Sequence, residues 1–184
     1  MNQIKTNKNI DRGIIVGRLQ PIHNGHVKVI ETILKEVNEL IIVIGSAQYS
    51  HSLDNPFTAG ERSTMVKEAL NEVDIDSNRY YIIPIQDISN HYLWVHHIKM
   101  LTPLFNKVYS GNPLVRRLFS ENGYNVEKIK PFNRDEFSGR QIRKNIAEDK
   151  KWKDSVPKSV AKFIEEIDGI NRIKQISEKE LNEL

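Results

Sequence analysis

The chain has 184 residues, enough for one domain with a substantial hydrophobic core. It contains no cysteine, which excludes disulfide scaffolds, thiolate metal sites and cysteine nucleophiles and favours a cytoplasmic protein. The net charge of +3 is too small to indicate nucleic-acid binding, and no apolar run is as long as a membrane span. We therefore expect neither a nucleic-acid partner nor a membrane partner.

Short apolar runs alternate with helical periods along the chain up to residue 131. Strands are expected at residues 13–17, 40–44, 80–85, 107–111 and 125–129, the last of them at an edge. The run at 40–44 is unbroken and β-branched, as in a strand buried on both faces of a parallel sheet. The alternation predicts an α/β fold with a doubly wound, Rossmann-like parallel sheet.

Polar residues indicate where several helices begin. Thr58 with Glu61, and Ser138 with Gln141, have the spacing of a capping box. Asn112 precedes a proline and is expected to cap another helix. For Glu61 we favour this capping role, together with a salt bridge, over contact with a ligand.

Only helical patterns follow residue 131. The first begins near Ser138, the second carries Val160 and Ile164 and is expected to end at Gly169, and the third is short and charged. The sequence thus predicts a helical C-terminal extension. We expect a single domain, divided into an N-terminal tail (1–11), an α/β core (12–131) and the helical C-terminal part (132–184).

The segment after the first strand, GRLQPIHNGH, has the residue types of a phosphate site. Gly25 lets the backbone approach a ligand, and the helix that begins there would point its N–H groups and positive dipole end at an anion. His23 and His26 would face the same pocket, and Arg18 would add guanidinium donors. A zinc pair is disfavoured because His23 lies outside the helix, so we expect no metal held by protein ligands.

Other segments extend this motif into a family resemblance. They are IGSAQ at 44–48, NPFTAGER at 55–62, VYSGNPLV at 108–115 and FSGRQIR at 137–143. In this order, and over about residues 12–176, they resemble the archaeal-type nicotinamide-nucleotide adenylyltransferases of the nucleotidylyltransferase superfamily. The H-x-G-H motif alone is typical of the whole superfamily, whereas GSAQ and NPFTAGER indicate the narrower family.

The resemblance implies a reaction: ATP and nicotinamide mononucleotide give NAD and pyrophosphate by direct in-line attack, without a covalent enzyme intermediate. His23, His26, Arg18 and Arg143 would be catalytic, and Mg²⁺ or another divalent cation would be held through the ATP phosphates. The implied ligand-binding residues are Gly17, Gln20, Gly25, Ser46, Asp87, Ile88, Trp94, Gly111, Asn112, Phe132 and Ser138. A homo-oligomer is also implied, with a hexamer as one candidate.

Several points stay open in the sequence. Arg140 stands where the superfamily signature has threonine, and its guanidinium either replaces that contact or points to solvent. Trp94 shares an apolar stripe with Ile98 and Leu101, which favours the core, whereas the resemblance implies stacking on the nicotinamide ring. Asp54 lies in a loop where a basic side chain would help to hold nucleotide phosphate. The carboxylate of Asp54 cannot make that contact. Nicotinamide and nicotinate mononucleotide are not distinguished, nor is the preferred metal.

Two other functions remain as alternatives. One is another nucleotidylyltransferase, acting on phosphopantetheine, an FMN precursor or glycerol phosphate. The H-x-G-H motif cannot distinguish such an enzyme from one that acts on nicotinamide mononucleotide. The other is a non-catalytic nucleotide-binding or RNA-binding module. The basic residues are interleaved with acidic ones, which disfavours RNA binding.

Overall fold

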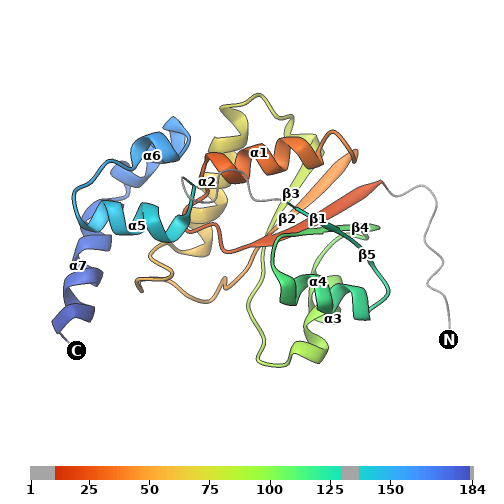
Figure 1. Ribbon diagram of the computed structural model, residues 1–184. Helices are drawn as coiled ribbons and strands as arrows, with labels where there is room; N and C mark the ends of the chain where they lie inside the picture. The colour runs from red at the N-terminus through yellow and green to blue at the C-terminus, as the bar shows by residue number, and fades with distance from the viewer. Residues whose placement is uncertain (1–10, 130–136, 183–184) are drawn as a thin grey trace.

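The computed structural model describes residues 11–129 and 137–182 (Figure 1). Its centre is a parallel sheet in the order β3-β2-β1-β4-β5. The strands are β1 (Arg12–Gly17), β2 (Glu39–Ile44), β3 (Tyr80–Pro84), β4 (Lys107–Ser110) and β5 (Asn125–Lys128). The predicted doubly wound α/β class is confirmed, with β5 at an edge as expected. The strand order reverses between β1 and β4, and ligands of such sheets bind beyond that point.

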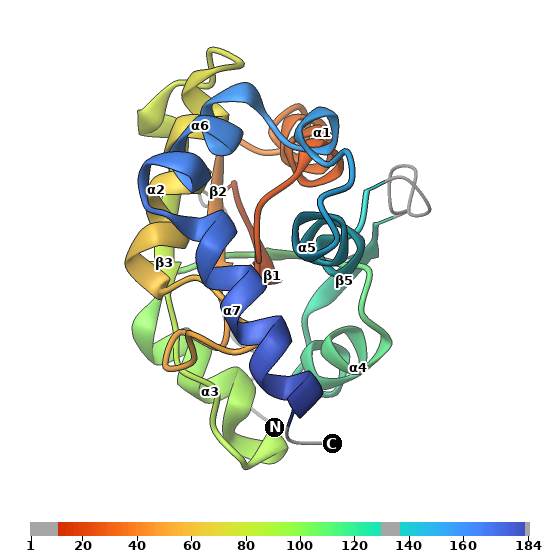
Figure 2. The same ribbon diagram turned by 90° about the vertical axis from the view of Figure 1, so that its left-hand side faces the viewer.

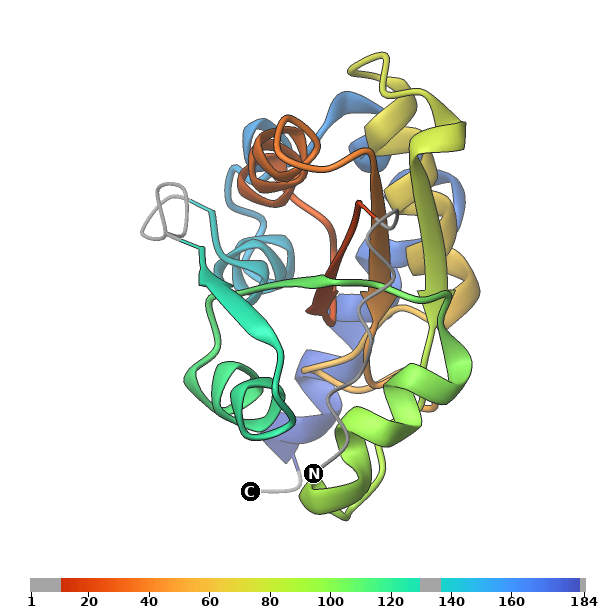
Figure 3. The same ribbon diagram turned by 90° about the vertical axis from the view of Figure 1, so that its right-hand side faces the viewer.

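Two pairs of helices cover the two faces of the sheet (Figure 3). They are α1 (Asn24–Ile33) and α2 (Ala59–Asn71) on one face, and α3 (His91–Leu101) and α4 (Pro113–Glu121) on the other. Successive side chains of β2 point to opposite faces. Leu40 and Ile42 join the core beneath α1 and α2, while Ile41 and Val43 join the core beneath α3 and α4. The prediction of a strand buried on both faces is confirmed.

Three helices form the C-terminal extension: α5 (Gly139–Ala147), α6 (Lys158–Glu166) and α7 (Gly169–Asn182). They gather at the end of the sheet where the parallel strands terminate (Figures 1 and 2). Ile142, Val160 and Ile173, one from each helix, are buried in the same core as α1 and α2. The extension therefore brings the start of α5 to the carboxyl ends of the strands, where a ligand is expected.

The expected role of Gly169 is wrong. The helix α6 ends at Glu166, and Gly169 begins α7, with the chain turning at Asp168, whose φ is 56°. A Cβ on Gly169 would lie 2.9 Å from the carbonyl oxygen of Ile164 and 3.0 Å from the ring of Phe57. Glycine is therefore required for the close approach of α7 to its neighbours and not for ending a helix.

The two predicted capping boxes have different outcomes. Thr58 and Glu61 form theirs: Glu61 N donates to Thr58 Oγ1 at 3.2 Å, and Thr58 N donates to Glu61 Oε2 at 2.8 Å. Ser138 is the N-cap residue of α5, but its side chain makes no capping hydrogen bond. Gln141 instead donates to Asn145 Oδ1 at 2.8 Å, so the second predicted capping box is wrong.

No helix within the described ranges combines the length and the apolar character needed to cross a membrane. Residues 1–10 of the expected tail lie outside the described residues. The expected single domain and its three parts therefore stay a prediction, which the cooperativity of unfolding would test.

Candidate active site

His23 and His26 form a reciprocal cap at the start of α1. The backbone N–H of each residue donates to Nδ1 of the other, both at 3.3 Å, and the rings stack with centroids 3.6 Å apart. Because Nδ1 accepts a hydrogen bond in both rings, the neutral imidazoles carry their protons on Nε2. The pair thus provides two N–H donors at the positive end of the α1 dipole.

Both histidines are neutral at pH 7. Burial lowers the pKa of His23 to about 4. Burial lowers the pKa of His26 as well, and the neighbouring His23 lowers it further. At this pH the imidazoles therefore offer hydrogen bonds rather than positive charge, and the charge of the site comes from arginine.

A pocket of about 360 Å³ lies between the loop after β1 and the start of α5. The predicted residues that line it are Arg18, Gln20, His23, Gly25, His26, Ser138 and Arg143. Arg140, whose role the sequence left open, lines the same pocket and is exposed. The structure therefore gathers the predicted phosphate-binding residues of both signature segments around one space.

Arg143 is held rigidly in the wall of this pocket. It is buried, its Nη1 donates to Gln20 O at 2.8 Å, and its Nε donates to Leu53 O at 2.7 Å. Gly139, one turn earlier, lies so close to Gln20 that a Cβ would meet the Gln20 carbonyl oxygen at 3.1 Å. Burial lowers the pKa of Arg143, an effect that Asp54 opposes and that Arg18 and Arg140 reinforce.

A second pocket, of about 210 Å³, opens where the strand order reverses between β1 and β4. The predicted residues Gly17, His26, Gly111 and Asn112 line it. Asn112 Oδ1 accepts from Leu114 N at 2.9 Å, which confirms the predicted cap of α4. Since His26 borders both pockets, one elongated ligand can contact them together.

A third pocket, of about 290 Å³, brings together Asp87, Ile88 and Trp94 with leucines of α4. Ser46 lies beside it, because its Oγ donates to Asp87 Oδ2 at 2.5 Å. Gln48 exchanges two hydrogen bonds with the backbone of Asp87, at 3.0 and 3.3 Å. These contacts fix the end of β2 against the segment after β3.

Trp94 is half-buried, packs edge-on against Phe119 at 5.7 Å and also lines the third pocket. The prediction of an apolar stripe formed by Trp94, Ile98 and Leu101 is only partly confirmed, because Ile98 is buried but Leu101 is 43% exposed. Val95 takes the buried position beside Ile98 instead. One face of the Trp94 side chain therefore belongs to the core while another part reaches the pocket.

The sequence did not predict the position of Arg62, which is fully buried. Its guanidinium donates to the carbonyl oxygens of Arg18 at 2.8 Å, Gly45 at 2.8 Å and Ser46 at 3.1 Å. It therefore ties the loop after β1 to the loop after β2. Burial lowers its pKa to about 10, so it stays charged at pH 7. The sequence signal that could have predicted this burial is the helical spacing, which places Arg62 on the same face of α2 as the apolar residue Met65.

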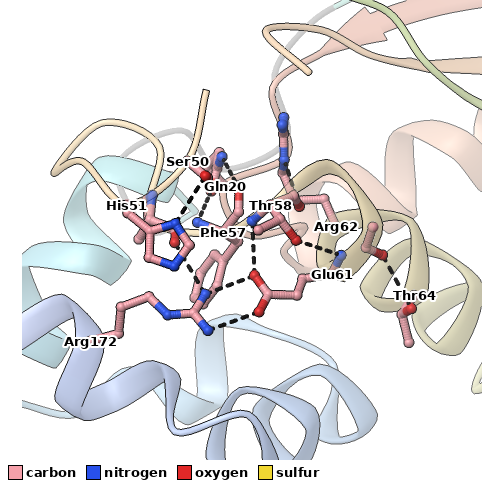
Figure 4. A network of polar contacts seen from close by, with 11 residues as sticks. Gln20, Ser50, His51, Phe57, Thr58, Glu61, Arg62, Thr64 and Arg172 are labelled. Carbon is pink, nitrogen blue, oxygen red and sulfur yellow. Dashed lines mark hydrogen bonds and ion pairs between the residues drawn. The ribbon is translucent and has the colours of Figure 1, made fainter. Parts of the chain in front are cut away.

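A network of long-range contacts supports the loop before α2 (Figure 4). The carboxylate of Glu61 receives hydrogen bonds from Arg172 Nη1 at 2.8 Å and Nη2 at 2.9 Å, so the predicted cap and salt bridge are confirmed. Partial burial raises the pKa of Glu61, but the hydrogen bonds from Arg172 and Thr58 lower it overall. Arg172 belongs to α7, and the C-terminal extension therefore braces the start of α2 and the loop before it.

Phe132, the remaining predicted contact, lies outside the described residues. Within the described residues, no three histidine or carboxylate side chains are grouped so that they could hold a metal ion.

Comparison with known proteins identifies the family. A family model described as cytidylyltransferase-like matches residues 14–145. The nicotinamide-nucleotide adenylyltransferase of Methanococcus aeolicus is 52% identical over 169 residues, covering 92% of this chain and 96% of the relative. That of Picrophilus torridus is 49% identical over 169 residues, covering 92% and 99%. The chain belongs to the nicotinamide-nucleotide adenylyltransferase family. The prediction that it is an enzyme is confirmed with this assignment.

Solved structures support the fold of this adenylyltransferase family member. A bifunctional NMN adenylyltransferase/ADP ribose pyrophosphatase from Francisella tularensis, complexed with AMP and a Mn ion, has a TM-score of 0.74 at 20% identity. The match covers 94% of this chain and 53% of that one, so the chain spans about half the length of the bifunctional protein. At this identity the likeness shows the fold alone.

Proposed function

We propose that this protein transfers the adenylyl group of ATP to nicotinamide mononucleotide, forming NAD and pyrophosphate. The observation that carries the proposal is the pocket of about 360 Å³, here called the phosphate pocket, which is lined by His23 and His26 at the N-terminus of α1 and by Arg18 and Arg143. The names of the relatives, at about half identity over nearly the whole chain, support the choice of substrates.

In the proposed reaction, a phosphate oxygen of the mononucleotide attacks the α-phosphorus of ATP in line. The bond from that phosphorus to the bridging oxygen breaks, and pyrophosphate leaves with the electron pair. No protein nucleophile is needed, so the contribution of the protein is positioning and charge stabilisation. His23 and His26 would donate to the α-phosphate oxygens, and Arg18 and Arg143 would neutralise the departing pyrophosphate.

The other predicted contacts divide among three subsites in this proposal. Gly17, Gly111 and Asn112, at the point where the strand order reverses, would border the adenosine part. Asp87, Ile88 and Trp94, with Ser46 behind Asp87, would bind the nicotinamide part. Ser138, Gly25 and Gln20 would border the phosphates. Arg140, which also lines the phosphate pocket, would add charge there.

A divalent cation would neutralise part of the charge of the ATP phosphates. The groups of the phosphate pocket are guanidinium, imidazole N–H and helix N-terminal N–H donors, which suit anions and not cations. The neighbouring carboxylate, Asp54, is paired with Arg143. The cation would therefore be held through the phosphates, and the crystallisation of a structural neighbour with AMP and a Mn ion is consistent with this.

The direct test is NAD formation from ATP and nicotinamide mononucleotide in the presence of Mg²⁺. We expect the wild-type protein to form NAD and His26→Ala to lose about 10²- to 10³-fold in kcat, the usual effect of removing one preorganised donor. His96→Gln, an exposed histidine of α3, is the matched control and should retain wild-type activity. Because His26 also accepts from His23 N, thermal unfolding of each variant would show that the fold is intact.

A thermal-shift panel separates this proposal from the related transferases. Stabilisation by nicotinamide mononucleotide supports it. Stabilisation by phosphopantetheine or FMN alone would instead show that the protein binds the substrate of another transferase. Nicotinate mononucleotide in the same panel would decide between the two pyridine substrates.

The homo-oligomer, with a hexamer as candidate, and the cytoplasmic location stay predictions. Sedimentation would test the first and cell fractionation the second.

A further inference from the structure

Asp54 lies between Arg18 and Arg143, two of the three arginines that line the phosphate pocket. Its Oδ1 accepts from Arg143 Nη2 at 3.1 Å, and its Oδ2 lies 3.9 Å from Arg18 Nη1. The carboxylate belongs to the loop between β2 and α2, and its side chain is 58% exposed. One acidic group therefore lies close to two of the permanent positive charges that would bind a polyphosphate.

Arg143 does not depend on Asp54 for its position. Its Nε and Nη1 donate to the carbonyl oxygens of Leu53 and Gln20, and the side chain is buried. Asp54 accepts a hydrogen bond from Nη2, so fewer N–H donors of the Arg143 guanidinium remain for a ligand. Since the two backbone contacts hold the guanidinium in place, replacing the carboxylate should change the charge of the site more than its geometry.

The charges around Arg143 support the same view. Arg18 and Arg140 both disfavour its charged form, while Asp54 favours it. Asp54 thus offsets part of the repulsion among three arginines that border one pocket. A nucleotide polyphosphate would offset the same repulsion more strongly, and Asp54 would repel it because the carboxylate lies 3.1 Å from Arg143 and 3.9 Å from Arg18.

We propose that Asp54 competes with the polyphosphate of the nucleotide for Arg143 and Arg18, and thereby weakens the binding of substrate triphosphate and product pyrophosphate. This inference rests on the proposed function, which places phosphates in this pocket. The exposed carboxylate can turn into solvent at small cost when phosphate binds, and it returns when pyrophosphate departs. Asp54 is thus a residue that sets affinity and product release, acting through the two arginines.

The test measures the affinity for inorganic pyrophosphate by isothermal titration calorimetry at low salt. We expect Asp54→Asn and Asp54→Ser to bind pyrophosphate about threefold or more tightly than the wild-type protein. Asp54→Glu keeps the charge and should stay near wild type. Asp74→Asn is the matched control: it removes the same charge at an exposed site beyond α2, where φ is 56° and asparagine is tolerated.

Turnover provides the second measurement. In NAD formation, inhibition by added pyrophosphate should strengthen in Asp54→Asn by the same factor as the binding. Unchanged or weaker pyrophosphate binding in both neutral variants would overturn the competition and make Asp54 a group that orients the arginines. Since the calorimetry requires no turnover, that failure is distinct from a failure of the proposed function, which would appear as no NAD formation by the wild-type protein.

Discussion

The side-chain amide of Gln20 pairs with the backbone of a single residue, Phe57 (Figure 4). Nε2 donates to Phe57 O at 2.9 Å, and Phe57 N donates to Oε1 at 3.0 Å. Both residues are buried, with Gln20 3% and Phe57 0% exposed. The carbonyl oxygen of Gln20 accepts from Arg143, so this pair links the loop after β1 to both Arg143 and the loop before α2.

Gln20→Glu tests this link with an almost isosteric change. At pH 7 the new carboxylate would face the Phe57 carbonyl without a proton to donate, which should destabilise the fold by about 2–3 kcal/mol. The burial raises the pKa of the new carboxyl above its unfolded value, so the loss relative to wild type should shrink as the pH falls. Chemical denaturation at several pH values measures it.

The control for that variant is Gln141→Glu, which introduces the same charge on the exposed side of α5. We expect this change to remain within about 0.5 kcal/mol of wild type. Equal stability losses in the two variants would contradict a structural role for the Gln20–Phe57 pair.

Arg62 should be indispensable for stability although its side chain lines none of the three pockets of the site. Arg62→Met would leave the carbonyl oxygens of Arg18, Gly45 and Ser46 without their buried donor, and we expect a loss on the order of 3 kcal/mol or more. Arg62→Lys, which keeps the charge but has fewer donors, should be intermediate. Arg117→Met removes an exposed arginine of α4 and should change the free energy of unfolding by less than about 1 kcal/mol.

The buried histidine pair predicts acid sensitivity. The pKa of His23 is about 4 in the folded protein and about 6.5 when unfolded, so only the unfolded state takes up this proton between those values. The free energy of unfolding should therefore fall as the pH is lowered through this window, by up to about 3 kcal/mol from His23 alone. Urea denaturation between pH 7 and pH 4 would measure the slope.

His23→Asn isolates this effect, because asparagine also caps helices but does not titrate. We expect a shallower pH slope in this variant than in His96→Gln, the control that removes an exposed histidine. Parallel curves for wild type and His23→Asn would show that the acid sensitivity has another origin.

Trp94 should affect one substrate only. If its ring stacks on the pyridine of the mononucleotide, Trp94→Leu should raise KM for nicotinamide mononucleotide about tenfold and leave KM for ATP near wild type. Tyr92→Leu, on the same helix and 83% exposed, provides the matched control. Equal increases in both KM values would indicate that Trp94 supports the fold and not the subsite.

Much of the fold follows from local patterns in this sequence. The unbroken apolar run of β2 and the period of the helices depend on neighbouring residues, so each was visible without a partner. The Thr58–Glu61 cap and the H-x-G-H motif at the start of α1 are local in the same sense. Local patterns also misled at the Ser138–Gln141 spacing and at Gly169, whose contact with the distant Phe57 a local pattern does not contain.

The sequence by itself determined the class of the fold, the family and most of the residues that line the pocket between the loop after β1 and the start of α5, because these depend on residue type and short spacing. Only the tertiary structure decided which distant residues hold them in position and which charges lie beside them. Gln20 meets Phe57 across 37 positions, Arg143 meets Asp54 across 89, and Arg172 meets Glu61 across 111. Such pairs form when the loops after β1 and β2 and the helices α5 and α7 come together at one end of the sheet. Their energies depend on burial and on the hydrogen-bond partners within reach, and neither is fixed before the chain is folded.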